Sequence, residues 1–334
     1  MQNVVLIQGD GIGSEITNSV TTIFKEAGVK INWIPAIAGL EAYEKTGNPL
    51  PEETLDLIRT HKIALKGPLT TPVGTGFRSA NVTMRQKLDL YANIRPVESL
   101  EGVDTPFKNV DLVTFRENTQ GLYIGQERVS ETDKDYVELI GVITRKASEK
   151  IIRAAFEYAK KYGRKKVTLN HKANILKEST GLFLKVGQEV SKEYPEIEFQ
   201  DLIIDNMAMQ MVLKPQQFEV IVTTNLFGDI LSDLASGLVG GLGVTAGANI
   251  GDEYAVFEAV HGSAPDIAGK GVANPSALLF SSIMMLRHLE MEDDYQRIRQ
   301  ATLKALADVS SRTADLGGKG NTKTFTDSIC RNLA

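Results

Sequence analysis

The chain has 334 residues, of which 42% are hydrophobic and 24% are charged, a mixture typical of globular proteins. Its formal net charge of −5 gives no electrostatic case for binding nucleic acid or a membrane surface. The single cysteine, Cys330, excludes an internal disulfide and a metal cage built from cysteines.

The apolar runs of the sequence set an expectation for its location. None reaches the roughly 18 residues of a membrane span. The first apolar run, at residues 4–7, leaves no room for a signal or transit peptide, although a processed form of a longer precursor is compatible with the sequence. We therefore expect a cytoplasmic protein, whose length corresponds to two domains.

Strand-like and helix-like segments alternate along the chain. Short apolar, β-branched runs predict strands at residues 4–8, 63–66, 110–115, 139–144, 167–170 and 218–224. Amphipathic segments predict helices at residues 14–27, 147–162, 178–192, 277–289 and 294–310. This alternation predicts an α/β architecture with a largely parallel sheet.

The first strand is followed by the glycine-rich segment GDGIGSE, residues 9–15. The glycines permit a tight turn, but their spacing is not G-x-G-x-x-G. Ser14 is expected to cap the following helix, whose free amides would then face a ligand. A purely structural turn explains the motif equally well.

A basic and polar segment follows between residues 66 and 96. Its candidate binding residues are Lys66, Thr71, Ser79, Asn81, Arg85 and Arg95, to which Arg116 adds a third guanidinium at the end of the next strand. Arginine matches the geometry of a carboxylate with a planar fork of donors. Binding of a polyanionic acid requires that these arginines meet in the fold, and scattered surface arginines are the alternative.

Three further residues are candidates for proton transfer or metal binding. Tyr123 is expected in a polar, glycine-flanked loop, as a proton donor or as a packed surface aromatic. Lys172 directly follows a predicted strand, where a nearby cation would lower its pKa enough for proton transfer; a solvated lysine is the alternative. Asp205 ends another apolar run and is a candidate metal ligand.

The segment NLFGDILSD, residues 225–233, is the strongest chemical signal of the chain. A strand is expected to end at Asn225 and a helix to start near Gly228. Asp229 and Asp233 then share one helix face, where like charges repel unless a hard divalent cation such as Mg²⁺ or Mn²⁺ lies between them. Ligands bind at the carboxyl ends of strands in α/β sheets. The pattern therefore predicts a metal site rather than a solvated acidic face.

The segment at residues 258–275 is dense in glycine, proline and small polar residues, as in a functional loop. Its small side chains let a flat ring or a ribose approach the backbone. Asp266 can accept hydrogen bonds from a ribose diol and would repel a 2′-phosphate, which favours NAD over NADP. His261 fits a ligand contact and a structural histidine equally well.

Together these segments resemble the family of metal-dependent β-decarboxylating dehydrogenases, which act on isocitrate, homoisocitrate, 3-isopropylmalate or tartrate. The resemblance covers nearly the whole chain, and NLFGDILSD and HGSAPDIAGKGVANP are its most specific motifs. Ser79 and Asn81 in RSANVTMR are similar to the pattern of NAD-dependent isocitrate dehydrogenases. GLYIGQER, residues 121–128, is as similar to homoisocitrate dehydrogenases.

The resemblance implies a fold that is not the Rossmann fold. It implies two interlocked α/β domains of the isocitrate/isopropylmalate dehydrogenase type. The large, cofactor-binding domain would combine residues 1–98 and 251–334. The small domain, residues 99–250, would carry the dimer interface and an arm that clasps the partner, so that a homodimer, or a higher oligomer built from it, follows.

The resemblance also implies the reaction and its residues. The reaction would be the oxidative decarboxylation of isocitrate to 2-oxoglutarate and CO₂ with NAD, a step of the tricarboxylic acid cycle. Substrate carboxylates would be bound by Ser79, Asn81, Arg85, Arg95 and Arg116. Mg²⁺ or Mn²⁺ would be bound by Asp229, Asp233 and the partner subunit's Asp205. Protons would be handled by Tyr123, the partner subunit's Lys172 and the partner subunit's Asp205. Cofactor-binding positions would be Lys66, Thr71, His261, Gly262, Ala264, Asp266, Ile267 and Asn274.

Two rival interpretations remain open on the sequence. In the first interpretation, the protein catalyses the same reaction on homoisocitrate or 3-isopropylmalate. A non-catalytic regulatory subunit of a heteromeric isocitrate dehydrogenase is the second, and the presence of Tyr123, Lys172, Asp205, Asp229 and Asp233 argues against it. No nucleic acid or membrane partner is expected.

Overall fold

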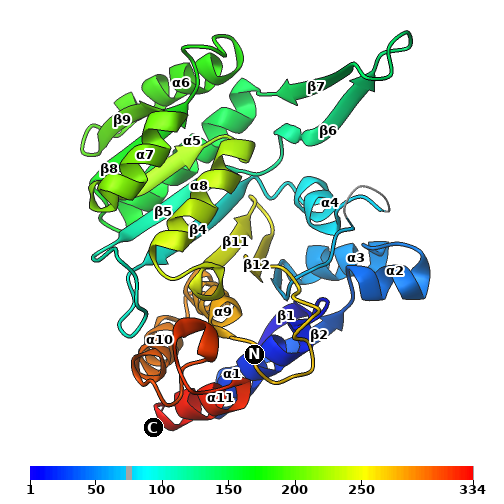
Figure 1. Ribbon diagram of the computed structural model, residues 1–334, viewed down its shortest axis with the longest axis vertical. Coiled ribbons are helices and arrows are strands. Elements are labelled where there is room, and N and C mark those ends of the chain that lie inside the picture. Colours follow the sequence, from blue (N-terminus) through cyan, green and yellow to red (C-terminus); the bar gives the residue numbers. More distant parts are fainter. Residues whose placement is uncertain (73–76, 334) are drawn as a thin grey trace.

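A computed structural model describes residues 1–72 and 77–333. Within them one mixed sheet carries helices on both faces (Figure 1). Its strands are β1 Gln2–Ile7, β2 Ile31–Ala36, β3 Ile63–Lys66, β4 Ala92–Glu98, β5 Asp111–Glu117, β8 Lys166–His171, β9 Glu198–Ile203, β10 Val220–Thr223, β11 Ala246–Ile250 and β12 Ala255–Ala259. The helices are α1 Gly13–Glu26, α2 Leu40–Thr46, α3 Glu52–His61, α4 Ala80–Lys87, α5 Arg145–Lys161, α6 Ser179–Val190, α7 Ile204–Leu213, α8 Asn225–Leu238, α9 Ser276–His288, α10 Glu292–Ala307 and α11 Thr322–Arg331.

The strand order is β2-β1-β3-β12-β11-β4-β5-β10-β8-β9. Both outer parts are parallel, as predicted, whereas β12–β11, β11–β4 and β4–β5 pair antiparallel. For β11 and β12 the reason is the length of the connection. Only residues 251–254 join β11 to β12, which is too short for the crossover that a parallel pair needs.

Amphipathic helices close the two faces of the sheet. In α1 the buried residues Ile16, Val20 and Ile23 recur at helical spacing and face the largest core cluster. In α5, Ile152 and Phe156 do the same against a second cluster under β8 and β10. The expected helices are therefore present, with ends that differ from the predictions by one to three residues.

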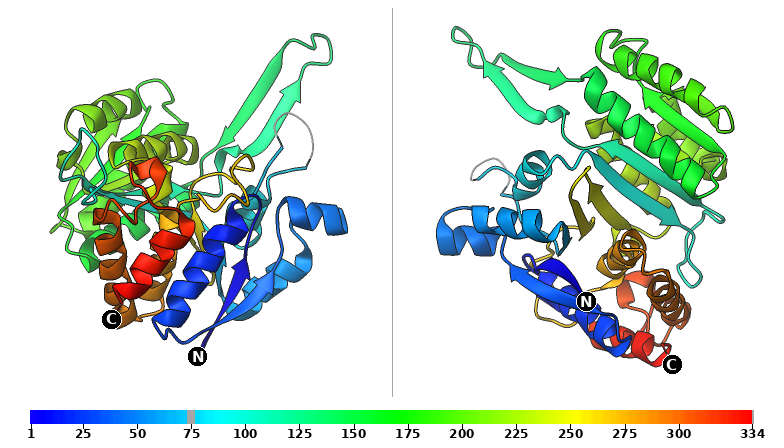
Figure 2. Two further views of the ribbon diagram at one scale, coloured as in Figure 1. Left: turned by 60° about the horizontal axis from the view of Figure 1, so that its bottom comes forward. Right: turned by 180° about the vertical axis from the view of Figure 1, so that it is seen from behind.

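A two-stranded arm, β6 Gly121–Val129 with β7 Val137–Val142, projects away from the body (Figures 1 and 2). It exposes Val129, Tyr136 and Leu139, each more than half to solvent. Such apolar exposure on an extended hairpin is typical of a surface that another chain covers. The predicted clasp with a partner stays a prediction.

The predicted domain boundaries coincide with the ends of strands in the middle of the sheet. Residue 98 ends β4 and residue 250 ends β11, and both strands belong to the continuous sheet. The division into domains stays a prediction. No helix in the described part of the chain is both long and apolar enough to cross a membrane.

Three local predictions were wrong. Helix α8 begins at Asn225, not near Gly228, because the amide of Gly228 already donates to the carbonyl of Thr224 in the first turn. Ser14 does not cap α1, whose N-cap residue is Ile12. Tyr123 lies in strand β6 rather than in a loop, since the Gly121–Val142 pairing begins the arm there.

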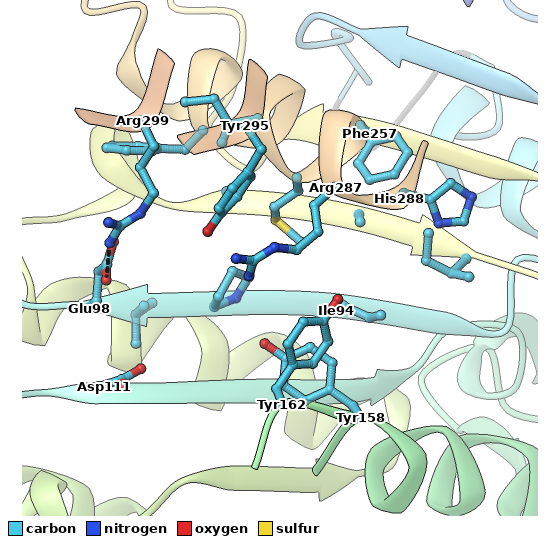
Figure 3. Close-up of a pocket in the computed structure, with 18 of the residues that line it drawn as sticks. Ile94, Glu98, Asp111, Tyr158, Tyr162, Phe257, Arg287, His288, Tyr295 and Arg299 are labelled. Carbon is cyan, nitrogen blue, oxygen red and sulfur yellow. Dashed lines mark hydrogen bonds and ion pairs between the residues drawn. The ribbon is translucent and has the colours of Figure 1, made fainter. Parts of the chain in front are cut away.

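The two faces of the sheet differ at β4 and β11. Alternate side chains of a strand point to opposite faces. On one face, Asn93 of β4 donates a hydrogen bond to Asn249 and Arg95 pairs with Asp233. On the other face, Ile94 and Ala248 line a cavity of about 300 Å³ between α5 and the α9–α10 pair (Figure 3).

Candidate active site

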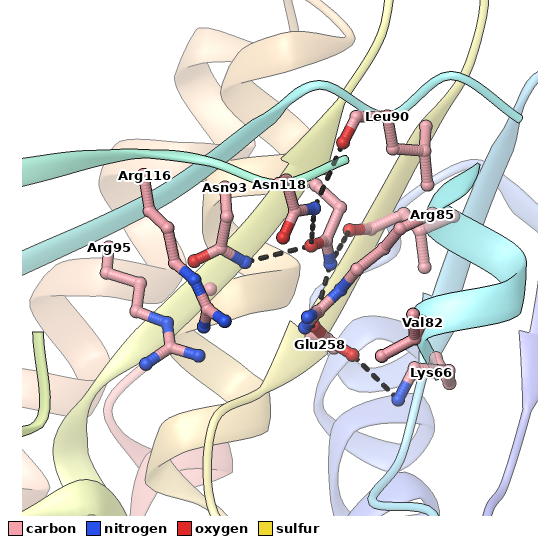
Figure 4. A network of polar contacts seen from close by, with 12 residues as sticks. Lys66, Val82, Arg85, Leu90, Asn93, Arg95, Arg116, Asn118 and Glu258 are labelled. Atoms are coloured by element: carbon pink, nitrogen blue, oxygen red, sulfur yellow. Dashed lines mark hydrogen bonds and ion pairs between the residues drawn. The ribbon is translucent and has the colours of Figure 1, made fainter. Parts of the chain in front are cut away.

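Three arginines from three elements converge beside the middle of the sheet (Figure 4). Arg95 comes from β4, Arg116 from β5 and Arg85 from α4. Arg95 is 6% exposed and Arg116 is 1% exposed. Burial, and then the positive charge of Arg85, lower the pKa of both guanidinium groups. Such concentrated positive charge in a buried place is suited to a ligand with several carboxylates.

Two carboxylates of α8 face these arginines. Asp229 pairs with Arg116, and Asp233 Oδ1 lies 3.1 Å from Arg95 Nη1. Burial disfavours ionisation of Asp229, but the charge of Arg116 and a hydrogen bond from Tyr123 outweigh it and lower the pKa of Asp229. Burial raises the pKa of Asp233, assisted by the charge of Asp229 and opposed by Arg95. The structure thus confirms that Asp229 and Asp233 lie on the same face of α8.

The residues that begin α8 hold Arg116 in place. Asn225 Oδ1 accepts hydrogen bonds from Arg116 Nε at 3.0 Å and from Nη2 at 2.7 Å. A Cβ atom on Gly228 would lie 2.5 Å from Arg116 Cγ. Glycine is therefore required at this position, because α8 packs directly against the side chain of Arg116. The motif NLFGD therefore combines a fixed guanidinium with a carboxylate.

Tyr123 joins this cluster from the arm strand β6. Its hydroxyl donates a hydrogen bond to Asp229, and its ring centroid lies 5.0 Å from the guanidinium carbon of Arg116. Burial and the negative charge of Asp229 raise the pKa of Tyr123. The hydroxyl is therefore protonated at neutral pH and directed to Asp229, as a proton donor requires.

A buried acidic residue that we did not predict organises the other side of the arginine cluster. Glu258 of β12 lies 2.7 Å from Lys66 Nζ and 2.9 Å from Arg85 Nη2 (Figure 4). Burial disfavours its ionisation, but the charges of Lys66 and Arg85 outweigh it and lower the pKa of Glu258. A charge inside the apolar run AVFEAV was the sequence signal for this residue.

The polar residues before Arg85 sit at the start of α4. Ser79 is the N-cap residue, and its hydroxyl accepts from the amide of Val82 at 3.4 Å and from the hydroxyl of Thr71 at 3.4 Å. Asn81 Oδ1 is buried without a hydrogen-bond partner among the described residues. An unpaired buried oxygen at this position fits a ligand donor.

Lys172 and Asp205 form a separate pair. Lys172 follows β8, Asp205 lies in the first turn of α7, and Nζ is 2.6 Å from Oδ1. The hydrogen bond from Lys172 lowers the pKa of Asp205. Within residues 1–72 and 77–333, no hydrogen bond or ion pair joins them to Asp229 or Asp233. One chain therefore does not assemble the predicted triad.

The donor set nevertheless fits a hard divalent cation in part. No group of three or more His, Cys, Asp or Glu side chains suited to a metal occurs among the described residues. Asp229 and Asp233 offer two carboxylates one helical turn apart, and their present partners are cations and a hydroxyl. Carboxylate oxygens are the ligands that Mg²⁺ and Mn²⁺ prefer, and a third must come from elsewhere.

The loop between β12 and α9 combines exposed residues with a buried polar atom that has no partner in the described part of the chain. His261 Nε2 is buried without a partner among the described residues, and burial lowers the pKa of His261. Asp266 is exposed, as is Gly262, whereas Ala264 and Ile267 are partly buried. Asn274 is fixed by a 2.9 Å hydrogen bond to Asp315. An unsatisfied ring nitrogen beside a small-residue loop fits an adenosine.

The GDGIG turn is structural. The amide of Ile12 donates to the carbonyl of Ser263 at 2.9 Å, and Asp10 accepts from the amide of Thr70 at 2.7 Å. A Cβ atom on Gly11, whose φ is +58°, would lie 2.0 Å from the carbonyl oxygen of Ser263. The glycines therefore let this turn pack under the loop that carries His261.

The chain is similar in sequence to known dehydrogenases. The chain is 49% identical over 329 residues to "Isocitrate dehydrogenase [NAD] catalytic subunit 5, mitochondrial" of Arabidopsis thaliana, covering 98% of this chain and 87% of that protein. It is 50% identical over 303 residues to "3-isopropylmalate dehydrogenase, chloroplastic" of Solanum tuberosum, covering 90% of this chain and 84% of that protein.

These comparisons correct the expectation of a cytoplasmic location. The Arabidopsis relative is named as mitochondrial, and so is the human "Isocitrate dehydrogenase [NAD] subunit alpha", which is 46% identical over 336 residues and covers 100% of this chain and 91% of that protein. Such names point to mitochondria rather than to the cytoplasm. The expectation was wrong because it was drawn from the apolar runs alone.

The fold comparison is equally close. The crystal structure of isocitrate dehydrogenase from Methylococcus capsulatus superposes with a TM-score of 0.97 at 55% identity, covering 100% of this chain and 99% of that chain. The expected fold type is thereby confirmed. Residues 3–329 match the model of the family described as "Isocitrate/isopropylmalate dehydrogenase". The chain therefore belongs to the isocitrate/isopropylmalate dehydrogenase family.

Proposed function

We propose that the protein is an NAD-dependent isocitrate dehydrogenase, which converts isocitrate and NAD⁺ to 2-oxoglutarate, CO₂ and NADH. The convergence of Arg85, Arg95 and Arg116 beside Asp229 and Asp233 carries this proposal. Three guanidinium groups match the three carboxylates of isocitrate. The paired aspartates supply the place for a divalent cation.

Ser79 and Asn81 select among the acids of the family. They lie at the start of α4, the helix that carries Arg85. Their short polar side chains suit a distal carboxylate better than the branched apolar group of 3-isopropylmalate. Homoisocitrate, with one more methylene, would move the distal carboxylate away from these residues. We therefore favour isocitrate over both rivals.

Different residues of the chain would bind the metal, orient the substrate and transfer protons. Asp229 and Asp233, with the partner subunit's Asp205, would hold Mg²⁺ or Mn²⁺, which when bound polarises the hydroxyl and later the carbonyl oxygen of the substrate. The arginines orient the acid. Tyr123 protonates carbon 3 after CO₂ leaves, and the partner subunit's Lys172 returns a proton to Tyr123.

NAD would occupy the loop between β12 and α9. His261 and Asn274 would contact the adenosine, with Gly262 and Ala264 allowing close approach and Ile267 packing beside it. Asp266 would accept hydrogen bonds from the ribose diol. Lys66 and Thr71, placed near Arg85 and Ser79, would lie at the nicotinamide end.

A homodimer would complete each site. Asp205 and Lys172 form their own pair at a distance from Asp229, so a second chain would have to bring them to the cluster. The apolar β6–β7 arm offers a surface for that chain. Each interface would then be two-fold symmetric, with every chain giving and receiving residues.

One assay tests the proposal. Purified protein is given isocitrate, homoisocitrate or 3-isopropylmalate, each with NAD or NADP, in the presence of Mg²⁺, of Mn²⁺ or of a chelator. We expect the highest kcat/KM for isocitrate with NAD and loss of turnover with the chelator. A higher kcat/KM for another acid would reassign the substrate. No turnover of any acid would contradict the proposal.

A further inference from the structure

The cavity on the far face of β4 and β11 is separate from the candidate active site. Its strand residues include Ile94 of β4 and Ala246 and Ala248 of β11 (Figure 3). Arg95, the residue after Ile94, points to the active face, where it pairs with Asp233. Helix α5 borders it on one side, and α9 and α10 border it on the other. Its volume of about 300 Å³ is at the lower end of the range for small-molecule sites.

The floor of the cavity is apolar and partly aromatic. Ile94, Ala248, Phe257 and Ile283 contribute to it, and each of them except the partly buried Ile94 is at most 2% exposed. These side chains are already ordered by the core of the sheet. A flat apolar group placed on them would lose contact with water without disturbing the packing.

The walls supply hydrogen-bond donors. Arg287 of α9 lies between two tyrosines, with its guanidinium carbon 3.7 Å from the ring centroid of Tyr295 and 5.3 Å from that of Tyr162 (Figure 3). Burial raises the pKa of Tyr158 to about 12, so that its hydroxyl is a donor at neutral pH. Lys161 Nζ lies 5.5 Å from the ring centroid of Tyr162.

Most other charges of the cavity are already neutralised. Arg299 is held by Glu98 at 2.6 Å, and Arg164 by Asp111 at 2.5 Å. The Arg287 guanidinium has a weaker contact, 3.4 Å to Glu292 at the exposed rim. In the described part of the chain no ion pair holds Lys161. Glu290 also lines the cavity, and no ion pair among the described residues holds it, so the cavity has no excess of positive charge as a whole. Arg287 is the lining arginine with the longest ion-pair distance, and its donors are therefore the most available to an added carboxylate.

We propose that this cavity binds a small organic carboxylate with a flat apolar body. The body would lie on the floor formed by Ala248, Phe257 and Ile283, and the carboxylate would accept from Arg287. A planar guanidinium held between two aromatic rings keeps one orientation, which lowers the entropic cost of binding the anion.

The site is in contact with the active face through shared strands. A ligand between α5 and the α9–α10 pair lies directly behind β4, whose next residue, Arg95, holds Asp233. A ligand packed against Ile94 therefore restrains the strand backbone that also carries Arg95. We expect that a carboxylate bound in the cavity changes the KM for isocitrate. This coupling rests on the proposed function, whereas the binding of the carboxylate is independent of it.

Calorimetric titration with 2-naphthoate tests binding, and 2-naphthalenemethanol is the neutral probe of the same shape. We expect saturable binding of 2-naphthoate in the presence of excess isocitrate, and weaker binding of the alcohol. Arg287→Gln should weaken 2-naphthoate binding by at least about tenfold, because one charge-assisted hydrogen bond is lost. Met284→Trp, which fills the cavity, should abolish it, while Lys304→Gln on the exposed side of α10 should not change it.

Three outcomes would overturn the binding site. These are no binding, displacement of the probe by isocitrate, and equal affinity of the Arg287→Gln and wild-type proteins. The coupling is judged separately from steady-state rates at saturating 2-naphthoate, where we expect the KM for isocitrate to change by about fivefold. A constant KM would reject the coupling alone. Absence of turnover would reject the proposed function and leave the calorimetric result standing.

Discussion

Asn249 donates a 2.7 Å hydrogen bond from its side-chain amide to Glu258, and both residues are buried. The carbonyl oxygen of the same side chain accepts from Asn93 at 2.8 Å and from Asn118 at 2.9 Å. One amide thus connects β4, β11, β12 and the end of β5. This network fixes the Glu258 carboxylate, which in turn orients Arg85.

Glu258→Gln should destabilise the protein at neutral pH. It leaves Lys66 buried without its counter-charge, which typically costs about 3–5 kcal/mol. The folded-state pKa of Glu258 is lowered, so its contribution to stability is present above its ordinary pKa of 4.5 and is lost as the pH falls below that value. The deficit of the variant should therefore shrink in acid.

Urea unfolding of both proteins at pH 7 and at a pH below 4.5 measures this difference. Glu253→Gln is the control, because its pair with Lys62 is exposed and should be worth less than about 1 kcal/mol. A deficit of Glu258→Gln that does not change with pH would contradict the role assigned to the ionised carboxylate.

Gly228→Ala should impair both stability and substrate binding. The added methyl group meets Arg116 Cγ at 2.5 Å, and such overpacking typically costs about 1–3 kcal/mol. The displaced guanidinium should raise the KM for isocitrate. Gly237→Ala in the same helix is the matched control, since no atom lies within 4 Å of its Cβ position. Thermal melting and steady-state kinetics should show a lower Tm and a higher KM for isocitrate in Gly228→Ala than in Gly237→Ala. Equal values in the two variants would count against this explanation.

Tyr123→Phe should lower kcat by about a hundredfold or more, the usual loss when a positioned proton donor is removed. The KM for NAD should stay the same, because Tyr123 contacts Asp229 and Arg116 and not the loop of His261. Steady-state kinetics measure both constants. Tyr136→Phe on the exposed arm is the control. Turnover close to that of the unaltered protein would exclude Tyr123 as the donor.

Mixing two inactive variants tests the shared site. Tyr123→Phe and Lys172→Met each remove one member of the predicted proton relay. If the relay spans two chains, mixed dimers contain one intact site, and a refolded equimolar mixture should regain about a quarter of wild-type turnover. Activity of the mixture equal to the mean of the two parents would place both residues in one chain's site.

Asp266→Lys combined with Ile267→Tyr should shift the preference from NAD toward NADP. The lysine removes the repulsion from a 2′-phosphate and adds a charge-assisted contact, so the ratio of kcat/KM for NADP over NAD should rise by about tenfold or more. The charge reversal Asp293→Lys on α10 is exposed and should leave the ratio unchanged. A wild-type preference for NADP would refute the assignment of Asp266.

Local patterns predicted much of the site. The spacing of Asp229 and Asp233 placed both on one face of α8, because that depends on helix periodicity alone. The start of α8 was predicted three residues late, because Gly228 was taken for a helix start when it serves the approach of Arg116. Glu258 was missed, since a single acid in an apolar run does not show which cations surround it.

Local patterns in the sequence predicted the chemical character of each motif and part of the secondary structure, because these depend on residues close together in the chain. The predicted elements were strands β1, β3, β5, β7, β8 and β10 and helices α1, α5, α6, α8, α9 and α10. The tertiary structure decided which motifs meet: Arg85 from α4 with Glu258 from β12, and Arg116 from β5 with Asn225 and Asp229 from α8. It also placed Ile94 and Arg95 on opposite faces of β4 at two different sites. Contacts between distant segments depend on strand order and register, which no local pattern contains.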